Sequence, residues 1–292
     1  MTRNFALLFL TALFSHALLG QTKTLQHNDV KRKYIVYIPK GYESAASRRY
    51  PVVFNFHGGG MTPAEQMLYT QMNKTADRHG FITVYPKGIK EDWNVGFGMS
   101  YKKGTDDIGF IETLLNQIEK DYKIDTQKVF AAGLSRGGFF CHRIAAELPH
   151  RFSAIATAGA SVPDSVAYYH QDRKEIGVLM VHGKADAVVD YTGKNNGYFS
   201  APKSYQYWQT QGNSKLGREK TIKHDPDKSD KTSAEIIEIK TGKKYVTLIS
   251  IENGGHTWPG ADDFNIGLPI GLTSKEIDFN EYMWEFFNKQ EL

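Results

Sequence analysis

The sequence contains a single cysteine, Cys141, among 292 residues. An intramolecular disulfide is therefore excluded, and a chain of this length can bury an adequate core without one. Cys141 follows a glycine-rich segment inside a predicted helix, where a cysteine acts as a small apolar residue. We expect a buried, unreactive thiol.

A strong imbalance of charge is also missing, since the formal net charge is +4 at pH 7. Phosphate binding needs clustered basic residues rather than a small surplus, so no nucleic-acid partner is predicted. The basic run Lys31-Arg32-Lys33 could serve an anionic ligand, but a solvated strand edge explains it better.

No apolar run is long enough to span a bilayer comfortably. The longest, residues 5–14, follows Arg3 and is interrupted by Ser15 and His16. With Gly20 offering a cleavage point, residues 1–20 resemble a signal peptide, and a retained anchor is the alternative. We expect a secreted protein, extracellular or periplasmic, with no membrane span in the mature chain.

Residues 21–292 are expected to form one domain, with residues 21–30 as a loose polar leader. Short β-rich apolar runs alternate with segments of helical spacing, which indicates an α/β fold with a mostly parallel sheet covered by helices on both faces. Strands are expected at 30–39, 51–56, 81–85, 129–132, 154–158, 176–181 and 245–251, and helices at 64–79, 105–122, 137–148, 205–211 and 275–288.

Residues 212–244 are polar and rich in lysine, and are expected to be an excursion from the sheet that could form a hairpin. Within them Asp225, Asp227 and Asp230 have a spacing that hints at a calcium loop. The glycine and distal glutamate of such loops are absent, so a solvated loop is predicted. We expect no metal and no cofactor.

Gly133-Leu134-Ser135-Arg136-Gly137 fits the G-x-S-x-G pattern, with a predicted strand before it and a helix after it. Flanking glycines relieve crowding in the sharp turn and leave the serine exposed at the end of the sheet. Ser135 is therefore the predicted nucleophile, and a capping serine in a glycine-rich turn is the alternative.

The partners of such a serine follow in the order acid, then histidine. Asp186 comes just after the strand 176–181, with Asp190 as a competing carboxylate in the same loop. His256 follows the strand 245–251 between flexible glycine-containing segments. We predict that His256 takes the hydroxyl proton and that Asp186 holds its tautomer.

His57-Gly58-Gly59-Gly60 ends the strand 51–56 and predicts an oxyanion loop. The donors are the N–H groups of Arg136 and of either Gly58 or Gly59. His57 and His182 are expected to be hydrogen-bonding props rather than catalysts.

Together these segments resemble the extracellular poly(3-hydroxybutyrate) depolymerase-like esterases and the feruloyl and acetylxylan esterases of carbohydrate esterase family one, in the α/β-hydrolase superfamily. Matching segments include His57-Gly58-Gly59-Gly60, Trp93-Asn94, Gly133–Gly138, His182–Asp186 and Gly255–Gly260. The resemblance covers roughly residues 30–260 and implies the same three catalytic residues. The chain departs from it in lacking the cysteines, and Arg136 stands where relatives often carry a small or amide residue. Its side chain could bind a substrate carboxylate or project into solvent.

The function predicted from this resemblance is a serine carboxylic-ester hydrolase acting on feruloyl or acetyl esters of plant polysaccharides. Trp93, Tyr191 and Trp258 adjoin the catalytic segments and could stack on an aromatic acid or a sugar, or simply pack the loops. The alternatives are a poly(3-hydroxybutyrate) depolymerase, a peptidase or acyltransferase with the same three residues, and a non-catalytic carbohydrate-binding protein. The sequence leaves the oligomeric state undetermined.

Overall fold

The structure is a computed structural model that describes residues 20–44, 47–171, 175–226, 228–263 and 270–290. Apart from Gly20, the predicted signal peptide lies outside the described residues, as does Asp227 of the possible calcium loop.

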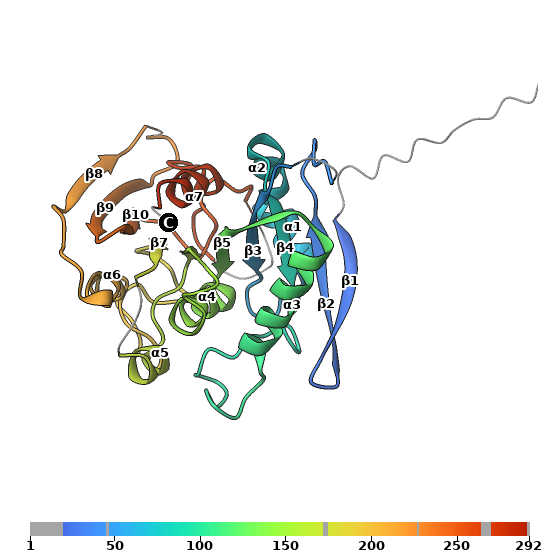
Figure 1. Ribbon diagram of the computed structural model, residues 1–292. Coiled ribbons are helices and arrows are strands. Elements are labelled where there is room, and N and C mark those ends of the chain that lie inside the picture. The colour runs from blue at the N-terminus through green and yellow to red at the C-terminus, as the bar shows by residue number, and fades with distance from the viewer. Residues whose placement is uncertain (1–19, 45–46, 172–174, 227, 264–269, 291–292) are drawn as a thin grey trace, which may run out of the picture.

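The described residues form one ten-stranded sheet with the order β1-β2-β4-β3-β5-β6-β7-β10-β9-β8 (Figure 1). The six strands from β4 to β10 in this order are mutually parallel, and the strands beyond them pair antiparallel. The strands are β1 (Gln21–His27), β2 (Val30–Tyr37), β3 (Tyr50–Phe56), β4 (Ile82–Pro86), β5 (Ile124–Leu134), β6 (Ala154–Ala158), β7 (Gly177–Gly183), β8 (Lys220–His224), β9 (Ser233–Thr241) and β10 (Lys244–Glu252).

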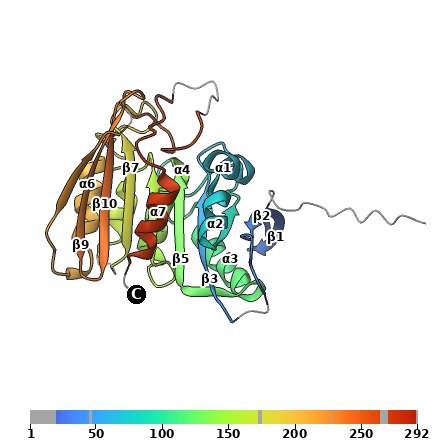
Figure 2. The same ribbon diagram turned by 90° about the horizontal axis from the view of Figure 1, so that it is seen from above.

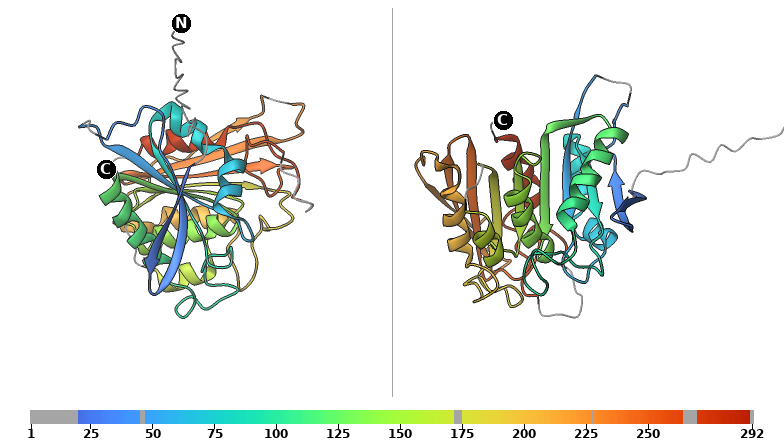
Figure 3. Two further views of the ribbon diagram at one scale, coloured as in Figure 1. Left: turned by 90° about the vertical axis from the view of Figure 1, so that its right-hand side faces the viewer. Right: turned by 60° about the horizontal axis from the view of Figure 1, so that its bottom comes forward.

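The central strands are mostly apolar because both faces of the sheet are covered. In β3, Phe54 packs into the core on one face, while its neighbour Val53 packs into the core on the other. Strand side chains alternate between faces, so such a strand must be apolar at nearly every position. The sheet twists strongly, and the strands cross at successive angles when it is viewed end-on (Figure 3, left).

Helices cover both faces, as the sequence predicts. The first core collects side chains of α3, α4, α5 and α6, and the second collects side chains of α1, α2 and α7. Figure 2 shows the strands as a row between these helices. The helices are α1 (Pro63–Thr70), α2 (Met72–His79), α3 (Asp107–Asp121), α4 (Arg136–Glu147), α5 (Asp164–Tyr169), α6 (Ala201–Gln209) and α7 (Phe279–Asn288), with a short 3-10 turn, η1 (Gln211–Asn213).

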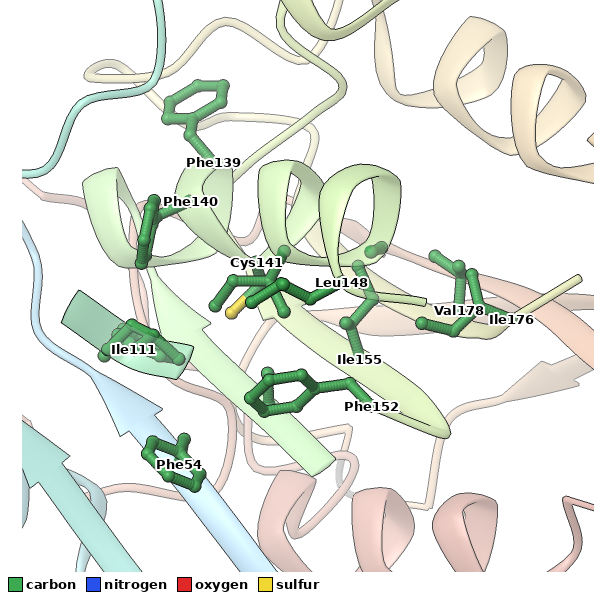
Figure 4. Close-up of a cluster of buried hydrophobic side chains, with 14 of the residues drawn as sticks. Phe54, Ile111, Phe139, Phe140, Cys141, Leu148, Phe152, Ile155, Ile176 and Val178 are labelled. Carbon is green, nitrogen blue, oxygen red and sulfur yellow. The ribbon is translucent and has the colours of Figure 1, made fainter. Parts of the chain in front are cut away.

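Cys141 lies in α4 and is fully buried among apolar side chains that include Phe152 and Ile155 (Figure 4). Burial raises the pKa of its thiol well above the ordinary value, because the thiolate would lose its hydration. The expected burial of Cys141 is confirmed, and the raised pKa agrees with the expectation of an unreactive thiol.

Several local expectations are wrong. The supposed leader is strand β1, which pairs antiparallel with β2. The hairpin considered for the polar segment is present in residues 220–241, but it extends the sheet rather than leaving it. The predicted helix 64–79 is interrupted at Gln71, which has a left-handed φ of 49°.

The basic run at the start of β2 is not uniformly solvated either. Arg32 is buried, and its guanidinium donates to Asp107 over 2.8 Å. Asp107 also accepts from the backbone N–H of Asn94, so this pair fastens β2 to the segment before α3.

None of the helices in the described ranges is long and apolar enough to cross a membrane.

Candidate active site

Ser135 stands between the end of β5 and the first residue of α4, with φ 52° and ψ −119°. A positive φ at a non-glycine residue is strained, and it persists here because the turn is over-determined by its neighbours. A Cβ at Gly137 would lie 2.3 Å from the carbonyl oxygen of Phe56, and one at Gly133 2.5 Å from Gly137. Only glycine fits these positions, and the hydroxyl of the half-buried Ser135 is left at the carboxyl edge of the sheet.

Asp186 and His256 come together from loops that follow β7 and β10. His256 Nδ1 lies 2.7 Å from Asp186 Oδ2, and Asp186 Oδ1 accepts the backbone N–H groups of Val188 and Val189. Burial alone would raise the pKa of Asp186, but hydrogen bonds from His182, His256 and Val189 hold it well below its usual range. The ionised carboxylate fixes the Nδ1–H tautomer and leaves Nε2 of His256 free to accept a proton.

Asp190, the competing acid, has a different role. Its Oδ1 accepts the backbone N–H of Thr192 over 2.8 Å and the hydroxyl of Thr192 over 2.7 Å. These hydrogen bonds lower its pKa and stabilise the turn that begins the 191–200 loop. The geometry therefore favours Asp186 as the acid.

Gly159 lies close to both Ser135 and His256. The N–H of Ser135 donates to Ala158 O over 2.8 Å, and a Cβ on the next residue, Gly159, would lie 2.8 Å from His256 Nδ1. Among the described residues no hydrogen bond closes between the hydroxyl of Ser135 and His256. Such contacts are commonly long without substrate and shorten when it binds.

The glycine loop after β3 lies directly against the nucleophile turn. A Cβ on Gly58 would be 3.6 Å from Ser135 Cβ, and one on Gly59 would be 3.6 Å from Arg136 Cβ. Arg136 is the first residue of α4, so its N–H has no acceptor within the helix and lies at the positive end of the helix dipole. Both glycines thus remain candidates for the second oxyanion donor.

His57 and His182 are placed as props. His57 Nε2 accepts the N–H of Gly88 over 3.0 Å, so its other nitrogen, Nδ1, donates to Gly58 O over 2.8 Å. Burial lowers the pKa of His57 and keeps it neutral. His182 Nε2 lies 2.8 Å from Val189 O and 3.4 Å from Asp186 Oδ2, behind the acid.

The stacking roles considered for Trp93 and Trp258 are wrong, because both rings are fully buried. Trp93 Nε1 donates to His57 O over 3.0 Å, and Trp258 Nε1 donates to Asn280 Oδ1 over 3.1 Å, so they hold the loops. Tyr191 is half-buried, and its hydroxyl lies 2.7 Å from Ser250 Oγ.

Sequence reasoning missed Phe97. This half-buried ring lies under the guanidinium of Arg136, 4.7 Å from its centroid, and packs edge-on against Phe139. Through Arg136 this ring lies beside the turn that holds Ser135, and it comes from a Gly-Phe-Gly segment that resembles an ordinary loop.

The side chain of Arg136 neither projects freely into solvent nor stands ready for a carboxylate of the substrate. Its Nε lies 2.9 Å from Asp92 Oδ1, and one terminal nitrogen donates to Phe97 O over 3.2 Å. Arg136 therefore ties the start of α4 to the loop between β4 and α3.

Within the described ranges, no group of three or more His, Cys, Asp or Glu side chains is arranged to hold a metal ion. Asp230 instead accepts the backbone N–H groups of Thr232 and Lys275 and stabilises the turn before β9.

Comparison with known proteins agrees with this architecture. The family described as "Putative esterase" matches residues 26–251. A bifunctional acetylxylan esterase/xylanase XynS20E of Neocallimastix patriciarum is 29% identical over 48% of this chain, which spans 20% of that protein. A probable feruloyl esterase C of Aspergillus clavatus is 26% identical over 56% of this chain, which spans 57% of that protein.

The putative esterase NocK of Nocardia uniformis subsp. tsuyamanensis is 23% identical over 84% of this chain and 76% of its own. The structure of an acetyl xylan esterase from Aspergillus awamori superposes with a TM-score of 0.64 at 15% identity, covering 92% of this chain and 100% of the other. The α/β-hydrolase fold expected from the sequence is confirmed by this superposition. Because the family match extends over most of its length, the chain belongs to the putative esterase family.

Proposed function

We propose that the chain is a serine carboxylic-ester hydrolase in which Ser135, His256 and Asp186 act together. The observation that carries the proposal is the 2.7 Å contact between His256 Nδ1 and the buried carboxylate of Asp186, beside the strained turn that holds Ser135. This arrangement supplies a base for the hydroxyl and a fixed anion behind the base.

In the first half of the reaction Ser135 Oγ attacks the ester carbonyl carbon while His256 Nε2 takes its proton. The carbonyl π bond breaks, and the oxyanion is held by the N–H of Arg136 and of Gly58 or Gly59. Collapse of this intermediate breaks the bond to the alcohol oxygen. The alcohol leaves with the proton from His256, and the acyl group stays on Ser135.

In the second half His256 takes a proton from water, and the hydroxide attacks the acyl carbon. The bond to Ser135 Oγ then breaks, Ser135 regains the proton from His256, and the free acid departs. Asp186 stays ionised throughout and stabilises the imidazolium, consistent with its lowered pKa.

We propose feruloyl or acetyl esters of a plant polysaccharide as substrates. The names of the relatives support this class, and the half-buried ring of Phe97 beside Arg136 would suit an aromatic acyl group. Poly(3-hydroxybutyrate) is the competing polymer.

Hydrolysis of methyl ferulate, p-nitrophenyl acetate and a short hydroxybutyrate oligomer by wild type and Ser135→Ala tests these proposals. We expect ester hydrolysis that Ser135→Ala abolishes, with labelling of Ser135 by a serine-directed phosphonate. Preference for the oligomer would replace the polysaccharide substrate with a polyester. A folded wild type that hydrolyses no ester and resists labelling would favour a binding protein.

We also propose that residues 1–20 direct export. The N-terminal sequence of the protein recovered outside the cytoplasm should begin at Gln21, whereas retention of Met1 on membranes would favour the anchor.

A further inference from the structure

A polar hollow lies in the loop that follows the catalytic acid. It has a volume of about 620 Å³, within the range of sites that hold a small ligand. The 191–200 loop and the starts of α5 and α6 surround it, and the lining includes Asp164, Lys194, Asn195, Asn196, Phe199 and Lys203.

The hollow lies near the turn that holds Ser135, with aromatic side chains between the two. Tyr198 lines it, and the ring of Tyr198 lies 5.0 Å from that of Phe139 and 6.0 Å from that of Phe97, centroid to centroid. Phe139 in turn donates its N–H to Ser135 O over 2.9 Å. On the other side, Tyr198 OH accepts the N–H of Asp190, close to Asp186 in the chain.

The loop is held in place rather than left open. Gly197 and Tyr198 donate their N–H groups to Lys194 O over 3.1 Å each, and Asp164 donates its own to Gly197 O over 3.0 Å. Ala201 donates to Tyr191 O over 2.9 Å. A rigid lining loses little conformational entropy when a ligand binds.

The polar groups that line the hollow indicate which class of ligand would fit it. The exposed amides of Asn195 and Asn196 both donate and accept hydrogen bonds, Lys194 donates, and the carboxylate of Asp164 accepts. Phe199 adds a half-buried aromatic ring, with Lys203 Nζ 3.6 Å from its centroid. Closely spaced donors and acceptors beside a ring suit a compact ligand rich in hydroxyl groups rather than an apolar one.

Two other hollows fit this role less well. One, of about 250 Å³ near β8 and β10, is lined by Lys184 and Glu252, which pair with each other over 2.9 Å. The other, of about 230 Å³, lies at the amino-terminal ends of the parallel strands and is lined by residues that include Gln127 and Glu175.

We propose that the hollow lined by Asp164, Lys194, Asn195 and Phe199 binds a sugar unit of the polysaccharide whose ester is cleaved at Ser135. This inference rests on the proposed function, because it places the carbohydrate part of the substrate. The ester and the sugar chain would then lie on either side of Phe97, Phe139 and Tyr198.

The test measures binding of oligosaccharides without an ester, so it does not depend on catalysis. Xylo-, arabino- and gluco-oligosaccharides of four units are titrated calorimetrically into wild type, Asn195→Ala, Lys194→Ala and the control Gln127→Ala. Hydrolysis of p-nitrophenyl acetate and thermal unfolding are measured for each variant.

We expect at least one oligosaccharide to bind, and the Asn195 and Lys194 variants to weaken binding at least about fivefold, roughly one lost hydrogen bond each. Gln127→Ala should bind as wild type does, and all variants should hydrolyse p-nitrophenyl acetate within about twofold of wild type. No binding by any oligosaccharide, or equal binding by all variants, would overturn the sugar site while leaving ester hydrolysis intact. Loss of acetate hydrolysis by wild type would instead count against the proposed function.

Discussion

Arg136 Nε lies 2.9 Å from Asp92 Oδ1, and this contact joins the two sides of the proposed oxyanion hole. In the proposed site, Arg136 would supply one donor from its own backbone at the start of α4. The carbonyl oxygen of Glu91, next to Asp92, accepts the N–H of Gly60 over 2.9 Å. The same loop therefore holds the glycine loop that is proposed to supply the other donor. The side chain of Arg136 is therefore placed to set the distance between the two donors.

Replacing this guanidinium should slow the chemical step without weakening substrate binding. Loss of an oxyanion donor costs about 100-fold or more in kcat. Displacement of two donors that remain present should cost less, and we expect Arg136→Gln to lower kcat about 10-fold with KM within about twofold. Steady-state hydrolysis of p-nitrophenyl acetate measures both.

Lys23→Gln is the matched control for Arg136→Gln, because Lys23 pairs with Asp121 over 3.2 Å at similar exposure but on strand β1. It should leave both constants unchanged. An Arg136→Gln variant with the kcat of wild type would show that the contact to Asp92 has no part in positioning the donors.

Gly159 offers a second test, because replacing it has two separate effects. One is backbone strain at a positive φ, and the other is contact between the added Cβ and His256. Its φ of +57° costs a non-glycine residue about 1 kcal/mol, and a Cβ there would lie 2.8 Å from His256 Nδ1. Gly159→Ala should push the imidazole from Asp186 and lower kcat at least about 100-fold, since small displacements of reacting groups have effects of this size.

Gly41→Ala is the control that separates backbone strain from contact with His256. Gly41 has a φ of +78° with no atom within 4 Å of an added Cβ, so it carries the backbone cost alone. We expect Gly159→Ala to lose at least as much stability in urea as Gly41→Ala, while Gly41→Ala keeps full activity. Equal activities in the two variants would place His256 away from Gly159.

The three candidate catalytic residues were predictable, because each combines a recognisable sequence motif with a position after a predicted strand. Ser135, Asp186 and His256 each follow a largely apolar strand, and the carboxyl ends of parallel strands meet at one end of the sheet. The order of nucleophile, acid and base along the sequence then assigns their roles, although this order alone does not distinguish Asp186 from Asp190 as the acid. That separation depends on Thr192, whose N–H and hydroxyl both bind Asp190.

The misses have physical causes too. Strands β1 and β8 lie at the two edges of the sheet, and β8 is exposed at every position, so neither carries the apolar pattern of a strand. The burial of Trp93 depends on stacking against Phe140 in α4, at a centroid distance of 5.0 Å. The buried pair of Arg32 with Asp107 joins distant segments, and nothing local to β2 indicates it.

Asp186 and Asp190, both in the loop after β7, should have very different effects on kcat when each is replaced by asparagine. Asp186→Asn removes the charge that stabilises the imidazolium and the preference for the Nδ1–H tautomer, and should lower kcat about 10⁴-fold. Asp190→Asn should keep kcat within about threefold and lose at most about 1 kcal/mol of stability, because the amide oxygen can still accept from Thr192 but lacks the charge of the carboxylate. Hydrolysis of p-nitrophenyl acetate and unfolding in urea measure the two effects, and the reverse ranking would make Asp190 the acid.

His142 should make the fold sensitive to mild acid. It is fully buried in α4, its Nδ1 accepts the indole N–H of Trp208 over 3.1 Å, and burial lowers its pKa from 6.5 to about 3. Between these values the unfolded chain binds a proton that the folded chain does not, so the free energy of unfolding falls as the pH falls. One pKa unit is about 1.4 kcal/mol, which predicts a loss of about 2 kcal/mol between pH 7 and pH 5.

His142→Gln removes the titrating group but keeps an acceptor for Trp208. Unfolding in urea at pH 7 and pH 5 should show that the variant loses about 2 kcal/mol less than wild type over this interval, whatever its stability at pH 7. His57, whose pKa is also lowered by burial, is present in both proteins, so its contribution cancels in the comparison. Equal losses in the two proteins would mean that His142 is protonated in the folded state. Both ring nitrogens would then be donors, so the indole N–H of Trp208 could no longer donate to Nδ1.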